Sequence, residues 1–345
     1  MRKMLDAGPY AYAKACGILS KSFMGKRISS LSGLHSLSEL DTLIFPNHHS
    51  ELPGKELLSD LQNRIIARAV RQILVIIASF TKPPEIIVRM LRVYEYSDLK
   101  TCINYIISKK KEPPRICDIG RFRTVNFDAY PDIAEMIKDS EFNSLLSEDI
   151  NSIKDGSADI IDIEIKIDSF FYQELVKSLS ELSGEDRNIV RRFLADEISL
   201  RNCTWALRLR TYYNMRDKET VKRLMKINLF TRTDREISLA DDALKSLDFP
   251  LDTRLPWESW KWKNLLNPEE SGVHWKADAR HFQNAASQYL YKHAMQGFHC
   301  LPMSASSIFY FIKLKQFEED LLTSIAEGFA LGIDSTVVFK LLEVS

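Results

Sequence analysis

The sequence predicts an all-α protein, because helical periodicity runs through most of the chain while helix breakers are few. The 345 residues include only 12 Gly and 12 Pro, and 45% are hydrophobic, which is enough for packed cores. A disordered or collagen-like chain is therefore excluded. The 47 basic and 47 acidic residues leave no net charge, so nucleic acid or an anionic membrane would need a local patch to bind.

The first helical hairpin is predicted between residues 57 and 107. Apolar residues recur at steps of three and four from 57 to 80, which is the spacing of one helix face. Pro83 and Pro84 then end this helix, since proline lacks the N–H and clashes with the preceding turn. A second periodic segment runs from 85 to 107 and ends in three lysines at 109–111, where the helix dipole favours cations.

The same arrangement returns twice along the chain. In the middle, a helix over 170–179 is followed by a longer one over 185–210. Towards the C-terminus, helices over 277–298 and 304–329 are separated by a break at Pro302. Each pair therefore predicts another helical hairpin.

Shorter segments precede the hairpins. Residues 37–45, 131–146 and 239–266 contain short helical patterns. Residues 160–167, with the sequence IIDIEIKI, alternate apolar and charged side chains as a strand does. Since the surrounding chain is helical, we expect a short extended linker here.

The three hairpins share a position in their second helices, where an acidic or amide residue precedes a small or apolar one. With hairpins near a hundred residues apart, this recurrence predicts three copies of one helical unit, at 1–112, 113–215 and 216–345, with boundaries that may interleave. The alternative is that any all-α chain yields unrelated hairpins. We expect structural roles near helix crossings for the repeated residues, which are Asp98, Leu99, Asn202, Cys203, Asp320 and Leu321.

The sequence shows little that would support chemistry. It contains no phosphate-binding GxxxxGK[ST] or GxGxxG loop and no HExxH zinc motif. The pair Asp241–Asp242 lacks a further carboxylate at helical spacing, and the adjacent ligands His299 and Cys300 fall where a helix should end. The five cysteines form no CxxC and are expected as thiols in a reducing compartment. We therefore expect no catalytic residue, no cofactor and no metal.

Tryptophans gather in one segment near the start of the third unit. Trp257, Trp260 and Trp262 alternate with lysines, and Trp275 follows. Aromatic rings beside cations can stack on bases or lie at the level of lipid headgroups. Buried packing is the favoured interpretation, since indoles are mostly buried.

No segment predicts a membrane span or a signal peptide. The most apolar run, ILVIIA at 73–78, is far shorter than the ~18 residues that a membrane helix needs. Charged residues interrupt the N-terminal segment before an apolar stretch of signal-peptide length develops. The chain is therefore expected to be soluble and cytoplasmic. A soluble chain can still attach to a membrane complex.

Short motifs along the whole chain resemble the C subunit of V-type and archaeal A-type rotary ATPases, called d in eukaryotes. The segment Tyr10-Ala11-Tyr12-Ala13 is similar to the N-terminal Y-x-Y-A-N-A-R of that family, although Lys14 and Cys16 replace its asparagine and arginine. Residues 197–202, EISLRN, resemble the family's E-[IL]-D-x-[KR]-N helix, and DSEFNSLL at 139–146 resembles T-x-Y-x-x-x-L. Asp98-Leu99 and Asp320-Leu321 resemble the copies of the helix motif.

This resemblance implies a funnel of three similar helical bundles related by pseudo-threefold symmetry. It implies a non-catalytic rotor subunit that links central-stalk subunits of the D and F type to the membrane proteolipid ring. Such a subunit would lie peripherally on the inner face of the membrane and transmit torque for proton or sodium transport. The competing interpretations are an all-helical scaffold or adaptor unrelated to ATPases and, third, an enzyme with an unrecognised helical active site.

Overall fold

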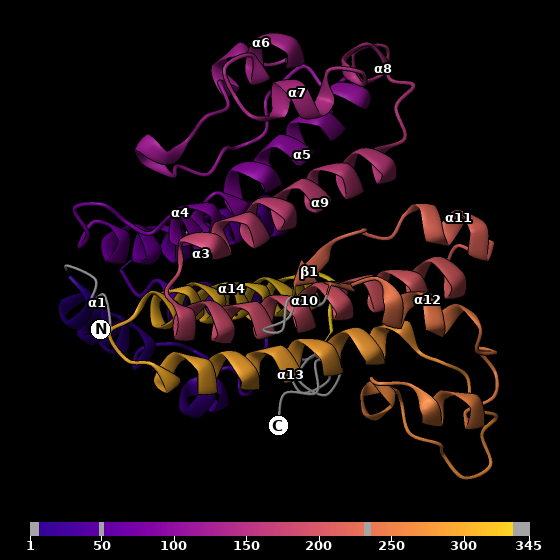
Figure 1. The fold of residues 1–345 in the computed structure, drawn as a ribbon. Helices are drawn as coiled ribbons and strands as arrows, with labels where there is room; N and C mark the ends of the chain where they lie inside the picture. The colour runs from indigo at the N-terminus through magenta and orange to yellow at the C-terminus, as the bar shows by residue number, and fades with distance from the viewer. Residues whose placement is uncertain (1–6, 48–51, 231–235, 334–345) are drawn as a thin grey trace. The chain divides into compact units, whose positions relative to one another are not determined.

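A computed structural model describes residues 7–47, 52–230 and 236–333, and it confirms the all-α fold class (Figure 1). Within these residues the only sheet is a two-stranded antiparallel hairpin. The chain divides into two compact units. The first comprises Met1–Tyr94, Arg115–Phe122 and Ala294–Ser345, and the second comprises Glu95–Pro114 and Arg123–His293.

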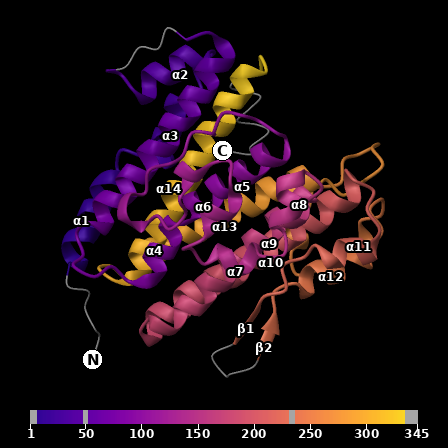
Figure 2. The ribbon, with the colours of Figure 1, turned by 90° about the horizontal axis from the view of Figure 1, so that it is seen from above.

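The first unit is organised around two long helices, α3 and α14, which lie side by side (Figure 2). Their contact buries Leu61 and Ile65 of α3 with Leu321, Leu322 and Ile325 of α14. These residues recur at steps of three and four, so each helix turns one apolar stripe towards the other. The helices of this unit are α1 (Gly8–Leu19), α2 (Leu37–Ile44), α3 (Gly54–Ile77), α4 (Glu85–Leu91) and α14 (Ala305–Ala330).

The start of α14 shows why the chain reverses at the predicted break. The Ser304 side chain accepts a hydrogen bond from the Ser307 amide, and the Ser307 side chain accepts one from the Ser304 amide. This reciprocal capping satisfies backbone donors that the first helical turn leaves without partners. The preceding helix, α13 (Ala279–Cys300), contributes residues to both units.

The second unit is organised around α10 (Gly184–Thr211), which packs against α9, α11 and α12. A cluster of rings formed by Tyr96, Phe142, Phe170 and Phe171 fills part of its core, with edge-to-face and stacked contacts. The remaining elements are α5 (Val93–Ile107), α6 (Ile133–Ile137), α7 (Phe142–Leu146), α8 (Ile150–Asp155), α9 (Ile160–Ser178), α11 (Asp217–Lys222), β1 (Asn228–Phe230), β2 (Glu236–Ser238) and α12 (Asp241–Leu247).

The expected extended linker at 160–167 is wrong, because these residues form the first two turns of α9. Asp159 caps the helix by accepting a hydrogen bond from the Ile161 amide. Ile163 and Ile167 are buried, and Phe171 and Leu175 continue the same face at steps of four. The same residues thus show both an alternating pattern and a helical pattern of apolar side chains. The helical pattern is the one whose side chains are buried in the structure.

Two further segments differ in detail from the expected helices. The segment predicted as one helix over 85–107 is divided into α4 and α5 at Arg92. Residues 255–265 form short 3₁₀ turns in place of a continued helix. The β1–β2 hairpin, in which Leu229 faces Ile237, was not predicted. The division of the chain into three units and their threefold superposition stay predictions.

Candidate functional site

The motif helix α10 fastens the β1–β2 hairpin through Asn202, whose side chain is 1% exposed. Its Nδ2 donates to the carbonyl oxygens of Met225 at 3.0 Å and Leu239 at 3.1 Å. Its Oδ1 accepts from the Met225 amide at 2.9 Å. Met225 precedes β1 and Leu239 follows β2, so one amide fixes both ends of the hairpin to the helix.

A carboxylate makes the corresponding contact on α5. Glu95, 1% exposed, accepts from the amides of Thr124 and Val125, the latter at 2.7 Å. Charge-assisted hydrogen bonds of this kind are about twice as strong as neutral ones. Glu95 therefore holds the non-helical segment around residue 125 against α5.

The third contact of this type lies in the first unit, on α14. Glu318 accepts from the Phe23 amide at 2.8 Å and forms a buried ion pair with Lys315. The Arg68 guanidinium lies 3.9 Å from the same carboxylate. Both Lys315 and Glu318 are 2% exposed, and burial lowers the pKa of Lys315 although Glu318 opposes the shift. Removing Glu318 would leave the buried Lys315 ammonium without its ion-pair partner.

We call these three contacts the helix anchors: Asn202 with Met225, Glu95 with Val125, and Glu318 with Phe23. The anchored amides at 23, 125 and 225 follow one another at intervals of about 100 residues. The first of these amides, that of Phe23, is bound by the last helix, α14. The threefold repeat that the sequence predicts stays a prediction.

The repeated residues predicted from the sequence lie close to the helix anchors, and only Asn202 is one of them. Leu99 and Cys203 are fully buried, and Leu321 is 6% exposed. Asp98 is half-buried and Asp320 is exposed. Their proposed structural role near helix crossings stays a hypothesis.

Sequence reasoning missed Glu95 and Glu318. Glu95 precedes the buried Leu99 by four residues, and Glu318 precedes the buried Leu322 by four. A carboxylate on the apolar face of a helix was therefore the available indication, because such a group must find hydrogen-bond donors.

A second set of contacts joins α10 to α9, and α9 to α5, through charged side chains. Asp168 of α9 lies 3.0 Å from Arg201 and 2.7 Å from Lys100. Burial by itself would raise the pKa of Asp168, but the two adjacent cations outweigh it and hold the pKa below its ordinary value. The Tyr172 hydroxyl donates to Glu197 at 3.0 Å, so Glu197 and Arg201, the two charged residues of the 197–202 motif, both have structural partners.

The tryptophan segment is a packing cluster, as favoured from the sequence. All four indoles are between 0% and 8% exposed. Each N–H has a protein acceptor, and the burial of the rings leaves them unavailable for stacking on a ligand. The acceptors are Pro250 O for Trp257, Asp242 O for Trp260, Ser199 Oγ for Trp262 and Asn267 O for Trp275.

The remaining candidates for chemistry have structural partners. His299 Nδ1 lies 3.0 Å from the Tyr12 hydroxyl, and Asp242 accepts from Ser199 at 3.0 Å. Burial raises the pKa of the Cys203 thiol well above its ordinary value, which disfavours a thiolate. Over the described ranges no group of three or more His, Cys, Asp or Glu side chains is arranged to hold a metal, and His48 and His49 lie outside them. Over the same ranges no helix is long and apolar enough to span a bilayer.

Comparisons with known proteins extend over most of the chain. A family model described as "ATP synthase (C/AC39) subunit" matches residues 46–338. An uncharacterized protein of Treponema pallidum (strain Nichols) is 26% identical over 337 residues, covering 96% of this chain and 95% of the relative. Both similarities therefore extend over most of the helices and not over one motif.

Proposed function

The chain belongs to the C/AC39 family of ATP synthase subunits, and from this premise we propose that it is a non-catalytic rotor subunit. In this role it links the central stalk to the membrane proteolipid ring and transmits torque between ATP turnover and ion transport. Its partners are the stalk subunits of the D and F type on one side and the ring on the other. It lies peripherally on the inner face of the membrane.

The helix anchors are the observation that best supports this role. A body that transmits torque has to resist shear between its helices and the segments that join them. Long packed helices supply part of that stiffness. In both units, buried hydrogen bonds that Glu95, Asn202 and Glu318 accept from backbone amides hold a non-helical segment against a helix.

The side chains that would perform catalysis in a nucleotide-hydrolysing subunit have no counterpart in the site described above. Its polar groups hold backbone amides, carbonyls and one another. This supports an accessory role, in which the chemistry takes place in other subunits of the complex.

The experiment is to compare ATP hydrolysis and ion transport in native membranes with and without this chain. Deletion should uncouple the two, so that ion transport is lost while the detached soluble head still hydrolyses ATP. Affinity purification from membranes should recover other ATPase subunits. An interface that carries torque should bury at least about 1,000 Å², and its charged part should weaken at high salt.

Two results would contradict the proposal. One is loss of hydrolysis by the head while its other subunits remain assembled. The other is recovery of the chain with unrelated proteins and no ATPase subunit, which would favour a helical adaptor.

A further inference from the structure

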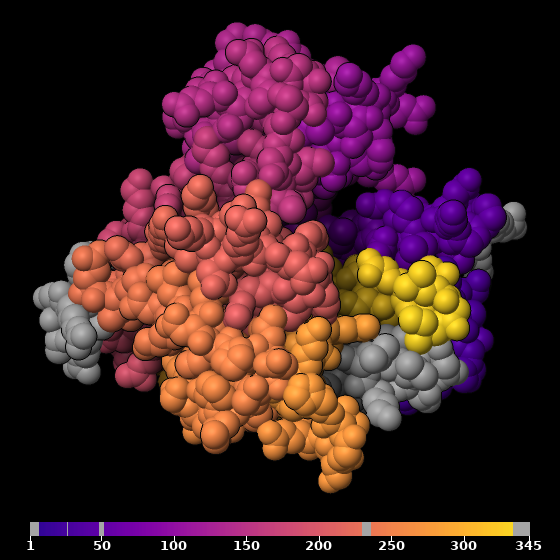
Figure 3. Space-filling view, turned by 90° about the vertical axis from the view of Figure 1, so that its right-hand side faces the viewer, coloured from indigo at the N-terminus to yellow at the C-terminus, as the bar shows by residue number. Residues whose placement is uncertain are grey.

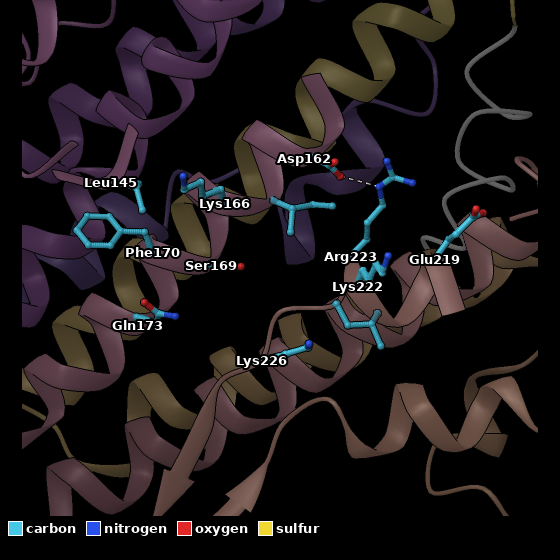
Figure 4. A pocket seen from close by; sticks show the side chains of 12 residues that line it. Leu145, Asp162, Lys166, Ser169, Phe170, Gln173, Glu219, Lys222, Arg223 and Lys226 are labelled. Atoms are coloured by element: carbon cyan, nitrogen blue, oxygen red, sulfur yellow. Dashed lines mark hydrogen bonds and ion pairs between the residues drawn. The ribbon is translucent and has the colours of Figure 1, made fainter. Parts of the chain in front are cut away.

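The charged groove of the second unit is balanced within the chain. It lies between α9 and the segment formed by α11 and residues 223–226, and in Figure 3 the salmon surface of α11 borders the magenta surface of α7 to α9. Asp162 faces Arg223 at 2.7 Å, as the close-up in Figure 4 shows. The four cations of this region are Lys166, Lys222, Arg223 and Lys226, and its four carboxylates are Asp149, Asp159, Asp162 and Glu219. Its charge therefore selects no ligand.

The first unit, in contrast, carries an excess of cations in its N-terminal segment. Residues 7–38 include four Lys or Arg and no Asp or Glu, although the whole chain has no net charge. The four are Lys14, Lys21, Lys26 and Arg27. Cations of this segment must therefore find their anions elsewhere in the fold or outside the chain.

Two arginines of the first unit meet at the ring of Phe23, and we call them the arginine cluster. The guanidinium carbon of Arg27 lies 4.5 Å from the centroid of this ring, and that of Arg68, on α3, lies 5.2 Å from it. The two guanidinium carbons are therefore within about 10 Å of each other. Phe23 is 2% exposed, and Glu318 of α14 binds its amide. The cluster thus lies where α3, α14 and the segment after α1 come together.

The Arg68 guanidinium has no hydrogen-bond acceptor among the residues that the structure describes. Its side chain is 20% exposed, and the Glu318 carboxylate lies 3.9 Å away, which is too far for a hydrogen bond. Arg64, one turn earlier on α3 and 18% exposed, instead donates to Asp41 at 2.6 Å. Arg27 is exposed and donates one hydrogen bond, to the Lys21 carbonyl. Most N–H groups of the arginine cluster are therefore available to an acceptor from outside the chain.

The carboxylates around the arginine cluster leave it positively charged. Glu318 forms a buried ion pair with Lys315, so its one negative charge faces three cations when Arg27 and Arg68 are included. Glu319 adds little, because burial raises its pKa to about 8 and keeps it mostly protonated at pH 7. Burial lowers the pKa of Arg68, and Arg27 lowers it further, while Glu318 opposes both effects. Three cations against one carboxylate leave an excess of two positive charges.

The neighbouring turns of α3 supply no carboxylate to offset this excess. Asp41 and Asp60 lie 2.6 and 2.7 Å from Arg64, and Asp60 is also 3.0 Å from Arg115. These two carboxylates are thus matched by two cations. Arg71, on the turn after Arg68, is exposed, and its side chain has no ion pair within the described part of the chain. The surroundings therefore add positive charge.

The charge and the donor geometry together indicate the kind of ligand. A guanidinium presents a planar fork of N–H groups that matches two oxygens of a phosphate, and its charge strengthens these hydrogen bonds. An excess of two positive charges is neutralised by one dianion. We propose that Arg27 and Arg68 together bind a phosphate-type dianion beside Phe23. The phosphate is that of a soluble ester or of a lipid headgroup, and the contact is chemically the same in both cases.

The test is a titration of the purified full chain, so it does not depend on the proposed rotor role. The soluble probe is glycerol phosphate, with chloride at equal ionic strength as the reference. The lipid probe is a phosphatidylcholine vesicle that contains phosphatidic acid, whose headgroup is a phosphate monoester, and pure phosphatidylcholine is its reference. A ligand of the folded state raises the unfolding temperature, and hydrogen exchange at the amides of residues 22–28 should slow. Binding of glycerol phosphate supports a soluble ester, and binding of the phosphatidic acid vesicle alone supports a headgroup.

Variants locate the binding at the arginine cluster. R27Q changes an exposed side chain and should weaken binding of the effective probe at least about tenfold. The matched control R121Q removes another exposed arginine of the first unit, which lies 5.2 Å from the ring of Phe122, and it should change affinity less than about twofold. R68K keeps the charge beside Glu318 and the fold but loses the planar fork, so it should weaken binding at least about threefold. Binding of neither probe, or equal binding by R27Q and R121Q, would overturn the proposal.

Discussion

Replacing Asn202 by alanine should destabilise the second unit more than any other single polar-to-alanine change on α10. The substitution removes three hydrogen bonds of 2.9–3.1 Å. It leaves the Met225 amide and the carbonyls of Met225 and Leu239 without their partner in an environment where Asn202 itself is 1% exposed. Each such bond contributes about 1 kcal/mol net, and a buried group left without a partner costs about 1–3 kcal/mol. We expect a loss of about 3–4 kcal/mol in the free energy of unfolding.

Tryptophan fluorescence measures this loss directly. All five tryptophans, Trp205, Trp257, Trp260, Trp262 and Trp275, belong to the second unit, so urea unfolding followed by their emission reports on that unit alone. With a slope of about 2 kcal/mol per molar urea, the midpoint for N202A should fall by about 1.5–2 M. Amide exchange at Met225 should accelerate at the same time, because its acceptor is gone.

Two further variants make the measurement decisive. N104A removes an exposed asparagine from α5 of the same unit and should change the free energy of unfolding by less than about 0.5 kcal/mol. N202D keeps the acceptor for the Met225 amide but turns an oxygen towards two carbonyls, and it should be at least as damaging as N202A at neutral pH. If N202A and N104A unfold at the same urea concentration, Asn202 does not hold the hairpin.

Three predictions concern the first unit, and hydrogen exchange of α14 amides can measure each. G297A would place a Cβ 2.3 Å from the ring of Tyr310, which is fully buried, so it should lower the free energy of unfolding by about 1–3 kcal/mol. The control G17A has open space around its Cβ and should stabilise α1 by up to about 1 kcal/mol. E318A should lower the free energy of unfolding by about 3–5 kcal/mol, because it leaves the buried Lys315 ammonium without its partner. Limited proteolysis near Phe23 should then increase, and unchanged cleavage there would contradict the contact between Glu318 and the Phe23 amide. Burial raises the pKa of Glu319 from 4.5 to about 8, so the folded state binds a proton that the unfolded chain has released above pH 4.5. Stability should therefore fall as the pH rises from about 4.5 to 8, and E319Q should remove this dependence; an unchanged pH profile in E319Q would refute it.

The sequence predicted the long helices because one periodicity dominates each of them. The 57–80 and 304–329 segments have a single apolar stripe, and both were found within a few residues of α3 and α14. At 160–167 two periodicities coincide, and only the position of the core decides between them. The β1–β2 hairpin has three residues per strand, too few for alternation to be recognised.

The helix anchors and the groove were beyond reach of the sequence for a different reason. An anchor is a pair whose members lie far apart in the chain, as with Phe23 and Glu318. A sequence pattern can show that Glu318 lies on an apolar face, but it cannot show which amide will meet it. The groove likewise combines residues from 145 to 226, so it exists only after α7, α9 and α11 have packed.

The chemistry of the three helix anchors follows from what each helix has to hold. A carboxylate can only accept, so Glu95 and Glu318 suit a segment that offers amide donors, and each binds a single stretch of backbone. The hairpin presents a donor at Met225 and acceptors at Met225 and Leu239, and the Asn202 amide serves all three through its oxygen and its NH₂ group. The amide is also neutral, so it needs no buried counter-ion such as the Lys315 that accompanies Glu318. The Asn202 side chain thus matches both kinds of group at the ends of the hairpin, while the carboxylates of Glu95 and Glu318 match segments that offer them amide donors.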